Sequence, residues 1–272
     1  MKLGSDTRAV VTGGGSGLGA ALVTMLAARG ARVVAADIDE ASARAIAERA
    51  GPNVQAVRCD VTQLADVEAL AATADRVLGG ADLVVNNAGV AVAGKVGDVP
   101  IEDWRWAIDV NLWGVIHGCH VFAPRLERQR RGHIVNVASA AGLLSPPRMA
   151  PYNTTKAAVI ALSETLHADL AAFGVGVSVL CPTFFRTNLV KSQRTSTDEV
   201  LRAAARGLVE KSKVTAESIA RATLAGVETD ALFIAPQADG RWMWRLKRLA
   251  PESFLRLSPK VAERLLARKA PA

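Results

Sequence analysis

The chain has 272 residues, half of them hydrophobic, which fits one large α/β domain or two smaller ones and excludes a chain that is disordered throughout. Its three cysteines, Cys59, Cys119 and Cys181, show no CxxC spacing and no disulfide framework, and no stretch reaches the ~18 apolar residues of a membrane-spanning helix. The first residues contain no apolar stretch of signal-peptide length, so we expect a cytoplasmic protein.

The net charge of +7 belongs to the C-terminal tail. Residues 240–272 hold nine Lys and Arg against two Glu, whereas residues 1–239 hold 24 basic and 24 acidic residues. A neutral body argues against nucleic-acid binding by the whole protein. We therefore divide the chain into a catalytic body, residues 1–239, and a basic extension, residues 240–272.

Short β-branched runs alternate with longer alanine-rich helical stretches along the body. Strands are predicted at 8–13, 31–37, 54–61, 81–89, 132–139, 176–182 and 231–236. Helices are predicted at 17–30, 39–51, 63–78, 102–130, 152–172 and 216–228, with a Pro-rich loop at 140–151 and a polar stretch at 186–215. Near-continuous apolar strands that alternate with helices indicate an α/β fold, a single doubly wound domain whose seven-stranded parallel sheet has helices on both faces.

A glycine-rich loop, TGGGSGLG at 12–19, joins the first predicted strand to the first helix. Glycines let the backbone turn tightly and approach a pyrophosphate, and the helix N-terminus offers free N–H groups and a positive dipole end. Glycine turns after strands are common, but this one lies inside a complete βαβ unit, which favours a dinucleotide site. The candidate cofactor-binding residues of the loop are Gly13, Ser16, Gly17, Leu18 and Gly19.

Asp37 ends the second predicted strand, eighteen residues after Gly19. A carboxylate there can accept hydrogen bonds from both hydroxyls of an adenosine ribose and would repel a 2′-phosphate. No Arg or Lys occupies residues 33–43 to receive such a phosphate. This pattern favours NAD over NADP, unless Asp37 merely ends the strand or caps the next helix.

Together these features resemble the short-chain dehydrogenase/reductase family over roughly residues 7–236. The motifs that carry the resemblance occur in the family's order: TGGGSGLG, Asp60-Val61, NNAG at 86–89, Asn111, Ser139 and Tyr152-x-x-x-Lys156. The resemblance implies a Rossmann-type fold and an NAD(P)-dependent oxidoreductase. It also implies a homodimer or homotetramer built through the helices at 102–130 and 152–172.

Tyr152 is the only tyrosine of the chain and precedes Lys156 by one helical turn. Hydride transfer at a carbon–oxygen bond requires a proton donor or acceptor at the oxygen. A free tyrosine has a pKa near 10, and we expect Lys156 to lower that value and also to bind the nicotinamide ribose. Ser139, just after the fifth strand, would hold the substrate oxygen beside the phenol.

Further roles follow from the resemblance alone. It implies that Asn111 positions a water that passes the proton from Lys156 to solvent, and that Asp60 and Val61 contact the adenine. It places Asn87, Ala88 and Gly89 along the cofactor, leaving Asn86 to brace the sheet, and Pro182 and Thr187 at the nicotinamide carboxamide. Thr183 replaces the glycine that usually follows this proline, so its hydroxyl is a further candidate near the cofactor.

Substrate specificity is expected from 140–151, 183–215 and the tail. AAGLLSPPRMAP and Phe184-Phe185 are largely apolar, which favours an apolar alcohol or ketone. Arg148 either meets a carboxylate or phosphate or is a solvent-exposed loop residue. The four histidines show no metal-binding spacing, so we predict no metal.

The tail alternates Trp242, Trp244, Leu246 and Leu249 with arginines, and Val261, Leu265 and Leu266 indicate a short amphipathic helix. Two interpretations compete: the tail packs on its own body or on a partner subunit, or it rests peripherally on an anionic membrane surface. For the body, the alternatives to an NAD(H)-dependent oxidoreductase are an NADPH-dependent carbonyl reductase and a dinucleotide-binding regulator without turnover.

Overall fold

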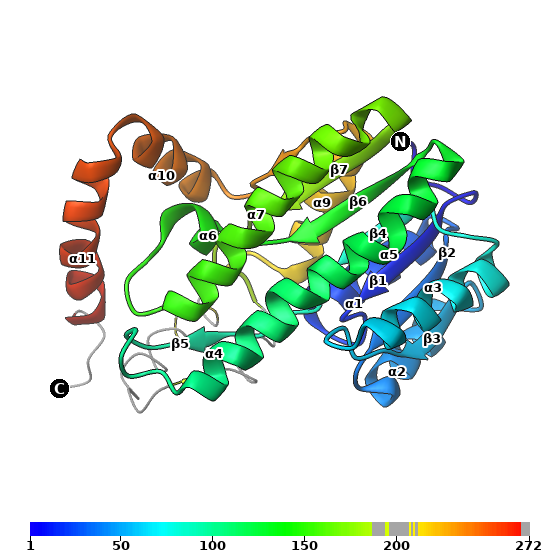
Figure 1. The fold of residues 1–272 in the computed structure, drawn as a ribbon, viewed down its shortest axis with the longest axis horizontal. Coiled ribbons are helices and arrows are strands. Elements are labelled where there is room, and N and C mark those ends of the chain that lie inside the picture. Colours follow the sequence, from blue (N-terminus) through cyan, green and yellow to red (C-terminus); the bar gives the residue numbers. More distant parts are fainter. Residues whose placement is uncertain (187–193, 196–206, 208, 210–211, 268–272) are drawn as a thin grey trace.

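A single parallel sheet organises the chain in the computed structural model, which describes residues 1–186, 194–195, 207, 209 and 212–267, with the backbone alone for 195 and 260–267 (Figure 1). Its seven strands lie in the order β3-β2-β1-β4-β6-β7-β9. The strands are β1 (Arg8–Thr12), β2 (Arg32–Asp37), β3 (Val54–Arg58), β4 (Leu83–Asn86), β6 (Gly132–Val137), β7 (Val175–Leu180) and β9 (Phe233–Ile234). The fold class and the seven-stranded parallel sheet expected from the sequence are confirmed.

Helices cover both faces of the sheet, as the apolar strands require. Against one face pack α1 (Gly17–Ala28), α2 (Glu40–Ala50) and α9 (Ala216–Glu228), through a core that includes Leu22, Ile46 and Leu224. Against the other pack α3 (Leu64–Leu78), α5 (Gly114–Gln129) and α7 (Ala150–Leu170), through a core that includes Leu70 and Phe122. Figure 1 shows α3, α5 and α7 on the near side of the strands.

The strand order reverses between β1 and β4, because the chain runs outward through β2 and β3 and then returns to the other side of β1. In open α/β sheets, ligands bind at such a switch point, outside the carboxyl ends of the strands. The glycine loop after β1 and the NNAG segment after β4 both lie at this edge.

Several elements differ from the sequence-based expectation. The predicted helix 102–130 is one continuous rod of α4 (Ile101–Ile108), a π-helical turn η1 (Asp109–Trp113) and α5. The predicted loop 140–151 contains α6 (Ala140–Leu144), because the Ser139 Oγ accepts a hydrogen bond of 3.1 Å from Ala141 N and caps the turn. A short 3-10 turn η2 (Ala171–Phe173) follows α7, and β5 (Val92–Ala93) pairs with β8 (Arg194–Thr195) outside the main sheet.

The tail forms two helices, α10 (Ala238–Leu249) and α11 (Pro251–Ala267), where the sequence predicted one short helix. Figure 1 shows them beyond the carboxyl ends of the strands, with α10 next to α6 and α11 farther from the sheet. None of the helices in the described part of the chain combines the length and apolarity needed to cross a bilayer.

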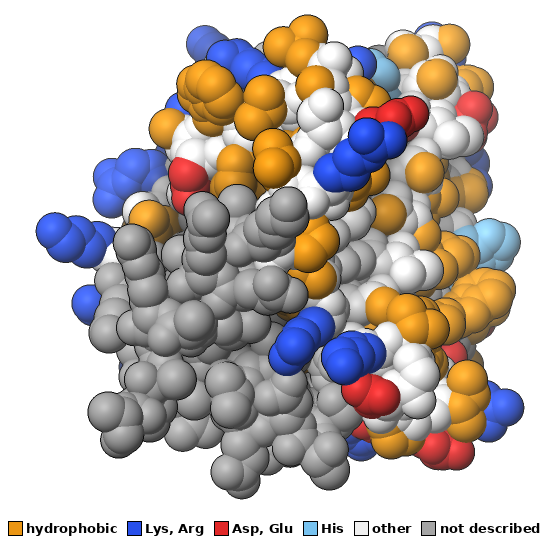
Figure 2. All heavy atoms as spheres, turned by 90° about the vertical axis from the view of Figure 1, so that its left-hand side faces the viewer, with side chains coloured by type: hydrophobic (Ala, Val, Ile, Leu, Met, Phe, Trp, Pro, Cys, Tyr) orange, Lys and Arg blue, Asp and Glu red, His pale blue; other side chains and the backbone are white. Residues whose placement is uncertain are grey.

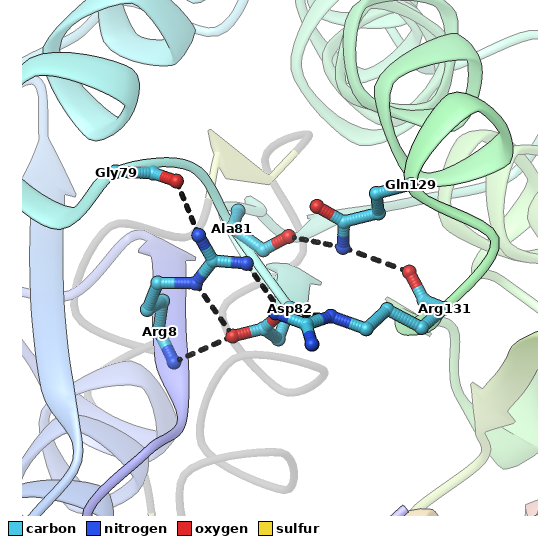
Figure 3. Close-up of polar contacts among 6 residues, drawn as sticks. All are labelled: Arg8, Gly79, Ala81, Asp82, Gln129 and Arg131. Carbon is cyan, nitrogen blue, oxygen red and sulfur yellow. Dashed lines mark hydrogen bonds and ion pairs between the residues drawn. The ribbon is translucent and has the colours of Figure 1, made fainter.

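An ion cluster around the buried Asp82 joins the amino ends of β1, β4 and β6 at the opposite edge of the sheet, and Figure 3 shows its contacts. The Arg8 Nε and Nη2 donate hydrogen bonds of 2.7 and 2.6 Å to the two carboxylate oxygens of Asp82, and the Arg131 Nε lies 3.3 Å from Asp82 Oδ1. Burial alone would raise the pKa of Asp82, but the hydrogen bonds and charge of Arg8, with the charge of Arg131, hold it below its usual value.

Candidate active site

The glycine loop turns back on itself between β1 and α1. Gly13 and Gly17 have φ of +64° and +52°, a region that favours glycine, and a Cβ on Gly19 would overlap the carbonyl oxygen of Gly13. Ser16 precedes α1 without capping it through its side chain, so the first N–H groups of the helix have no side-chain acceptor. This cradle fits the pyrophosphate of a dinucleotide.

Asp37 anchors the loop to the end of β2. Its Oδ2 accepts a hydrogen bond of 2.9 Å from Gly15 N, and its Oδ1 accepts one of 3.1 Å from Asp39 N. The nearest arginine downstream, Arg44, forms a 2.6 Å ion pair with Glu40 on α2. Asp37 therefore presents a carboxylate at the position where the sequence predicted contact with the adenosine ribose.

Asn87 joins the end of β4 to the same loop. Its Nδ2 donates hydrogen bonds to the carbonyl oxygens of Thr12 (2.8 Å) and Gly13 (3.2 Å), and its backbone N–H donates to Thr12 Oγ1 (3.0 Å). Asn86 points elsewhere and donates a 2.8 Å hydrogen bond to Asn136 Oδ1 inside the sheet. The distinction expected between the two asparagines, one at the cavity and one bracing the sheet, agrees with these contacts.

These elements enclose a cavity of about 730 Å³ at the carboxyl edge of the sheet. The predicted residues that line it are Gly13, Ser16, Gly17, Leu18, Asp37, Asp60, Val61, Asn87, Ala88, Gly89, Tyr152, Lys156 and Pro182. Gly19 lies behind the loop and allows its close turn, and Asn111, Ser139 and Thr183 are not part of the lining. Thr187 lies outside the described residues.

Seven lining residues escaped the sequence analysis: Ile38, Cys59, Val90, Trp106, Val110, Val137 and Ala138. Phe185, which the sequence analysis named for the substrate side, also lines the cavity. Most of the seven directly adjoin a predicted residue, as Val90 follows Gly89 and Cys59 precedes Asp60. Trp106 and Val110 have the i, i+4 spacing of one helix face, which is the only signal that would have grouped them. The Arg194 guanidinium lies 4.1 Å from the centre of the Trp106 ring and 3.3 Å from Asp103, so it holds the tryptophan in place.

Tyr152 lies in the first turn of α7, and only 8% of its surface is exposed. Burial raises the pKa of Tyr152, and a hydrogen bond with Ser139 opposes that rise. The Ser139 Oγ also lies 3.5 Å from the carbonyl oxygen of Pro182. Ser139 and Tyr152 are therefore brought together as predicted, at the end of the cavity that Pro182 closes.

Lys156 is buried one turn after Tyr152, and its Nζ donates a 2.8 Å hydrogen bond to the carbonyl oxygen of Val137. The Nζ lies 5.8 Å from the centre of the Tyr152 ring, and burial lowers the pKa of Lys156 to about 8. The expected lowering of the Tyr152 pKa is wrong for this structure, in which the net direction is upward. The physical reason is that desolvation of the phenolate outweighs the groups that favour it.

Asn111 lies in the π-helical turn η1 and is fully buried. Its Oδ1 accepts from Val90 N (2.8 Å), and its Nδ2 donates to the carbonyl oxygen of Val90 (2.9 Å) and to Thr155 Oγ1 (3.3 Å). The side chain thus clamps the segment after β4 against α7. Single π-helical turns are rare and occur often at functional sites.

The side chains of Thr183 and Asp60 contact protein groups at this edge of the sheet. Thr183 donates its backbone N–H to Gln237 Oε1 (3.0 Å), and its Cγ2 faces Gly240 of α10, so its side chain serves the tail rather than the cavity. The carboxylate of Asp60 accepts from Thr62 N (3.0 Å) and Thr62 Oγ1 (2.8 Å), which orders the turn after β3.

Arg148 does not line the cavity. Among the described residues, no group of three or more His, Cys, Asp or Glu is placed to hold a metal ion.

Comparison with known proteins places this geometry in a family. A sequence model of the short chain dehydrogenases matches residues 7–198. The chain belongs to the short-chain dehydrogenase family. Its fold and motifs are thus those of a family of oxidoreductases that bind nicotinamide dinucleotides.

Individual members are more than a third identical to the chain over the regions that align. The probable oxidoreductase EphD of Mycobacterium tuberculosis is 39% identical over 213 residues, which are 76% of this chain but 36% of that protein. The chain thus spans about a third of the length of this relative. The 1-deoxy-11-beta-hydroxypentalenate dehydrogenase of Streptomyces exfoliatus is 37% identical over 261 residues. The alignment covers 90% of this chain and 91% of that protein. A short-chain dehydrogenase/reductase of Burkholderia phymatum, solved in complex with NAD, is 36% identical with a TM-score of 0.88 over 93% of this chain and 96% of its own.

Proposed function

We propose that this protein is an NAD(H)-dependent oxidoreductase that transfers a hydride between nicotinamide and an apolar secondary alcohol or its ketone, with Tyr152 as the general acid and base. The observation that carries the proposal is the buried pairing of Tyr152 with Ser139 at one end of a dinucleotide-sized cavity, with Lys156 one helical turn away. The nicotinamide, when bound, supplies or accepts the hydride.

The chain's own residues handle the proton. During reduction, Tyr152 donates its phenolic proton to the substrate oxygen as the hydride reaches the carbon, and during oxidation it takes that proton back. Its raised pKa keeps the phenol protonated at neutral pH, which is the form that a general acid needs. Ser139 holds the substrate oxygen beside the phenol. Lys156 would hold the nicotinamide ribose of a bound dinucleotide, and Asn111 would position the water through which Lys156 exchanges its proton with solvent.

NAD is proposed over NADP because Asp37 presents its carboxylate at the end of β2. A 2′-phosphate there would meet a negative charge, and Arg44 is already paired with Glu40. The likeness in fold to a short-chain dehydrogenase/reductase from Burkholderia phymatum in complex with NAD supports nicotinamide dinucleotide binding in general. An NADPH-dependent carbonyl reductase is the alternative, and fluorescence titrations with NADH and NADPH separate the two.

An apolar substrate is proposed because the non-cofactor part of the lining is apolar. Val90, Trp106, Val110 and Phe185 all face the cavity, whereas none of 140–151 lines it. We therefore propose that Trp106 of α4, Val110 of η1 and Phe185 of the expected segment 183–215 form the apolar wall of the substrate site. The relative from Streptomyces exfoliatus is named for a hydroxy compound, 1-deoxy-11-beta-hydroxypentalenate, which is consistent with an alcohol as the substrate.

Replacement of Tyr152 by Phe tests the catalytic role, since it removes a single oxygen. We expect turnover of a responsive ketone to fall by about 10²- to 10⁴-fold while NADH binding persists. Thr154→Val, which removes an exposed hydroxyl from the same helix, is the matched control and should turn over normally. A Tyr152→Phe variant that retains turnover would eliminate the proposal, and retained biological function without turnover would favour a dinucleotide-binding regulator.

Assembly and location remain predictions. We propose a homodimer or homotetramer formed through α5 and α7, which Figure 1 shows on the near side of the sheet, and a cytoplasmic location. Light scattering of the purified chain tests the first, and cell fractionation tests the second.

A further inference from the structure

Helix α10 has one face on the body and one face in solvent. Trp244 stacks on Phe233 with ring centres 4.8 Å apart, and the Lys247 Nζ donates a 2.7 Å hydrogen bond to the carbonyl oxygen of Leu143 on α6. Gly240 packs so closely that a Cβ there would lie 2.7 Å from Thr183 Cγ2. These contacts, at spacings of four and three residues, fix the orientation of the helix on the body.

The opposite face carries an apolar stripe. Trp242, Leu246 and Leu249 follow one another at the same spacings of four and three, with 67%, 41% and 84% of their surfaces exposed. Leu255 and Leu257 of α11 are also exposed, at 44% and 58%, but they lie two residues apart and so on different faces of that helix. Trp242, Leu246 and Leu249 are called the tail face below. So much exposed apolar surface on a short hairpin indicates an interaction surface.

Basic residues border this stripe. Arg241, Arg245 and Arg248 each precede a residue of the stripe, so they form a parallel row on the same helix. Figure 2 looks onto the side of the molecule where α10 and α11 lie, and its upper part shows apolar and basic side chains next to one another. An apolar stripe bordered by arginines, with a tryptophan among the apolar residues, is the pattern of a helix that lies in a membrane interface.

Charge decides between the candidate occupants. The tail carries nine basic against two acidic residues, whereas the body is neutral, with 24 of each sign. A second copy of this chain therefore offers no net negative charge to the tail, while an anionic lipid surface offers both negative charge and an apolar layer. The Arg241 Nη1 donates hydrogen bonds of 2.7 Å to the carbonyl oxygens of Ala235 and Pro236, so Arg245 and Arg248 are the arginines left to meet a ligand. We propose that the tail face docks peripherally on an anionic membrane surface, with Trp242, Leu246 and Leu249 entering the interface and with Arg245 and Arg248 contacting lipid headgroups.

The docked face lies at the same end of the molecule as the cavity. α10 is fixed to α6, whose first turn is capped by Ser139, and to Thr183, which follows the cavity residue Pro182. If the proposed function holds, docking brings the substrate end of the cavity toward the bilayer, where apolar alcohols and ketones concentrate. The docking itself does not depend on that function.

Vesicle sedimentation of the full chain tests the docking. We expect the wild-type chain to sediment with vesicles of equimolar phosphatidylcholine and phosphatidylglycerol, not with pure phosphatidylcholine, and to be released at high salt because the headgroup contacts are screened. Leu246→Glu should weaken binding at least about tenfold, since it replaces an inserted apolar group with a repelled charge.

Val77→Glu is the matched control. Val77 lies on α3 with 38% exposure, close to the 41% of Leu246, and should bind vesicles like the wild type. The proposal is overturned if the wild type stays in solution with anionic vesicles, or if Leu246→Glu binds as the wild type does. Should Leu246→Glu instead convert a dimer to a monomer in light scattering without vesicles, the tail face is a subunit interface. Because binding is measured without substrate or dinucleotide, its failure leaves the proposed reaction untouched.

Discussion

The Lys156 Nζ donates its 2.8 Å hydrogen bond to the carbonyl oxygen of Val137, the last residue of β6. Both residues line the cavity, so one strand end holds the buried ammonium in place at the cavity wall. Lys156 is the only Lys or Arg among the described lining residues, and this hydrogen bond fixes the position of its ammonium group near Tyr152. Two consequences follow for Lys156, one for its chemistry and one for its titration.

Lys156→Met should abolish most of the activity and weaken NADH binding, because the variant can neither donate to the ribose nor carry charge. Burial lowers the pKa of Lys156 to about 8, so the charge is present below that pH and is lost as pH rises through it. NADH affinity of the wild type should therefore decline between about pH 7 and 9, and that of the variant should not. Fluorescence titrations across this range measure both.

Lys247→Met is the control for this prediction. Lys247 also donates to a backbone carbonyl, that of Leu143 at 2.7 Å, but lies outside the cavity lining. Its loss should leave the pH dependence of NADH affinity unchanged. An identical pH profile in the wild type and Lys156→Met would mean that another group governs binding.

Asp37→Ala should change cofactor preference and not only affinity. Loss of the carboxylate removes an acceptor for the ribose hydroxyls and also the repulsion of a 2′-phosphate, so NADH should bind about tenfold more weakly and NADPH more tightly. Asp39→Ala is the comparison, since Asp39 caps α2 next to Asp37 without lining the cavity, and it should leave the ratio unaltered. Equal losses for both dinucleotides in Asp37→Ala would show that the residue only orders the glycine loop through Gly15 N.

Sequence patterns predict the sheet well because each strand combines apolar content with a neighbouring break. Residues 33–36 are all fully buried, and β2 ends at Asp37 as the pattern indicates. The ends are less predictable: β9 comprises only Phe233 and Ile234, since β7 is its single partner at the sheet edge. Cavity residues that are neighbours of a sequence motif, such as Val90 after Gly89 and Cys59 before Asp60, can be predicted because the motif already places the end of a strand at the cavity.

The periodicity of apolar residues in the sequence does not predict which way an individual side chain points in the loops and in the tail. Thr183 looks like a cofactor ligand by position, but the contact with Gly240 turns it toward α10. Trp242 and Trp244 look equivalent in the sequence, although one is exposed and the other stacks on Phe233. These orientations depend on how the tail packs, which is a tertiary contact with no local signal.

Asp82→Asn should destabilise the fold without affecting dinucleotide binding. The change leaves Arg8, whose side chain is 14% exposed, without its counter-charge, which we expect to lower the free energy of unfolding by about 2–4 kcal/mol. The cluster lies at the amino ends of the strands, and none of its residues lines the cavity. Urea unfolding measures the loss, and NADH affinity should stay at the wild-type value.

Asp75→Asn provides the matched control. Asp75 pairs with Arg125 at 3.6 Å, but its side chain is 54% exposed, so the same substitution should lower the free energy of unfolding by less than about 1 kcal/mol. If both variants lose the same amount, burial of the Arg8–Asp82 pair contributes nothing particular to stability.

His133 should make the fold sensitive to acid. The Ser178 Oγ donates its hydrogen to the carbonyl oxygen of Ala231 at 2.7 Å, so it accepts at 2.8 Å from His133 Nε2, and the buried ring is neutral. Burial lowers the pKa of His133 to about 4, from about 6.5 in the unfolded chain. Between these values the unfolded chain binds more protons, so the free energy of unfolding falls as pH drops from about 6.5 to 4, by on the order of 3 kcal/mol in full.

His133→Gln cannot be protonated, so its unfolding free energy should fall less steeply over that pH window than that of the wild type. Urea unfolding at a series of pH values gives the two slopes, and their difference cancels the contributions of the carboxylates, Asp82 included. His120→Gln, at an exposed position on α5, should keep the wild-type slope. Parallel curves for the wild type and His133→Gln would show that the imidazole is protonated in the folded protein, with Asp230, 3.6 Å from Nδ1, as the group that then stabilises it.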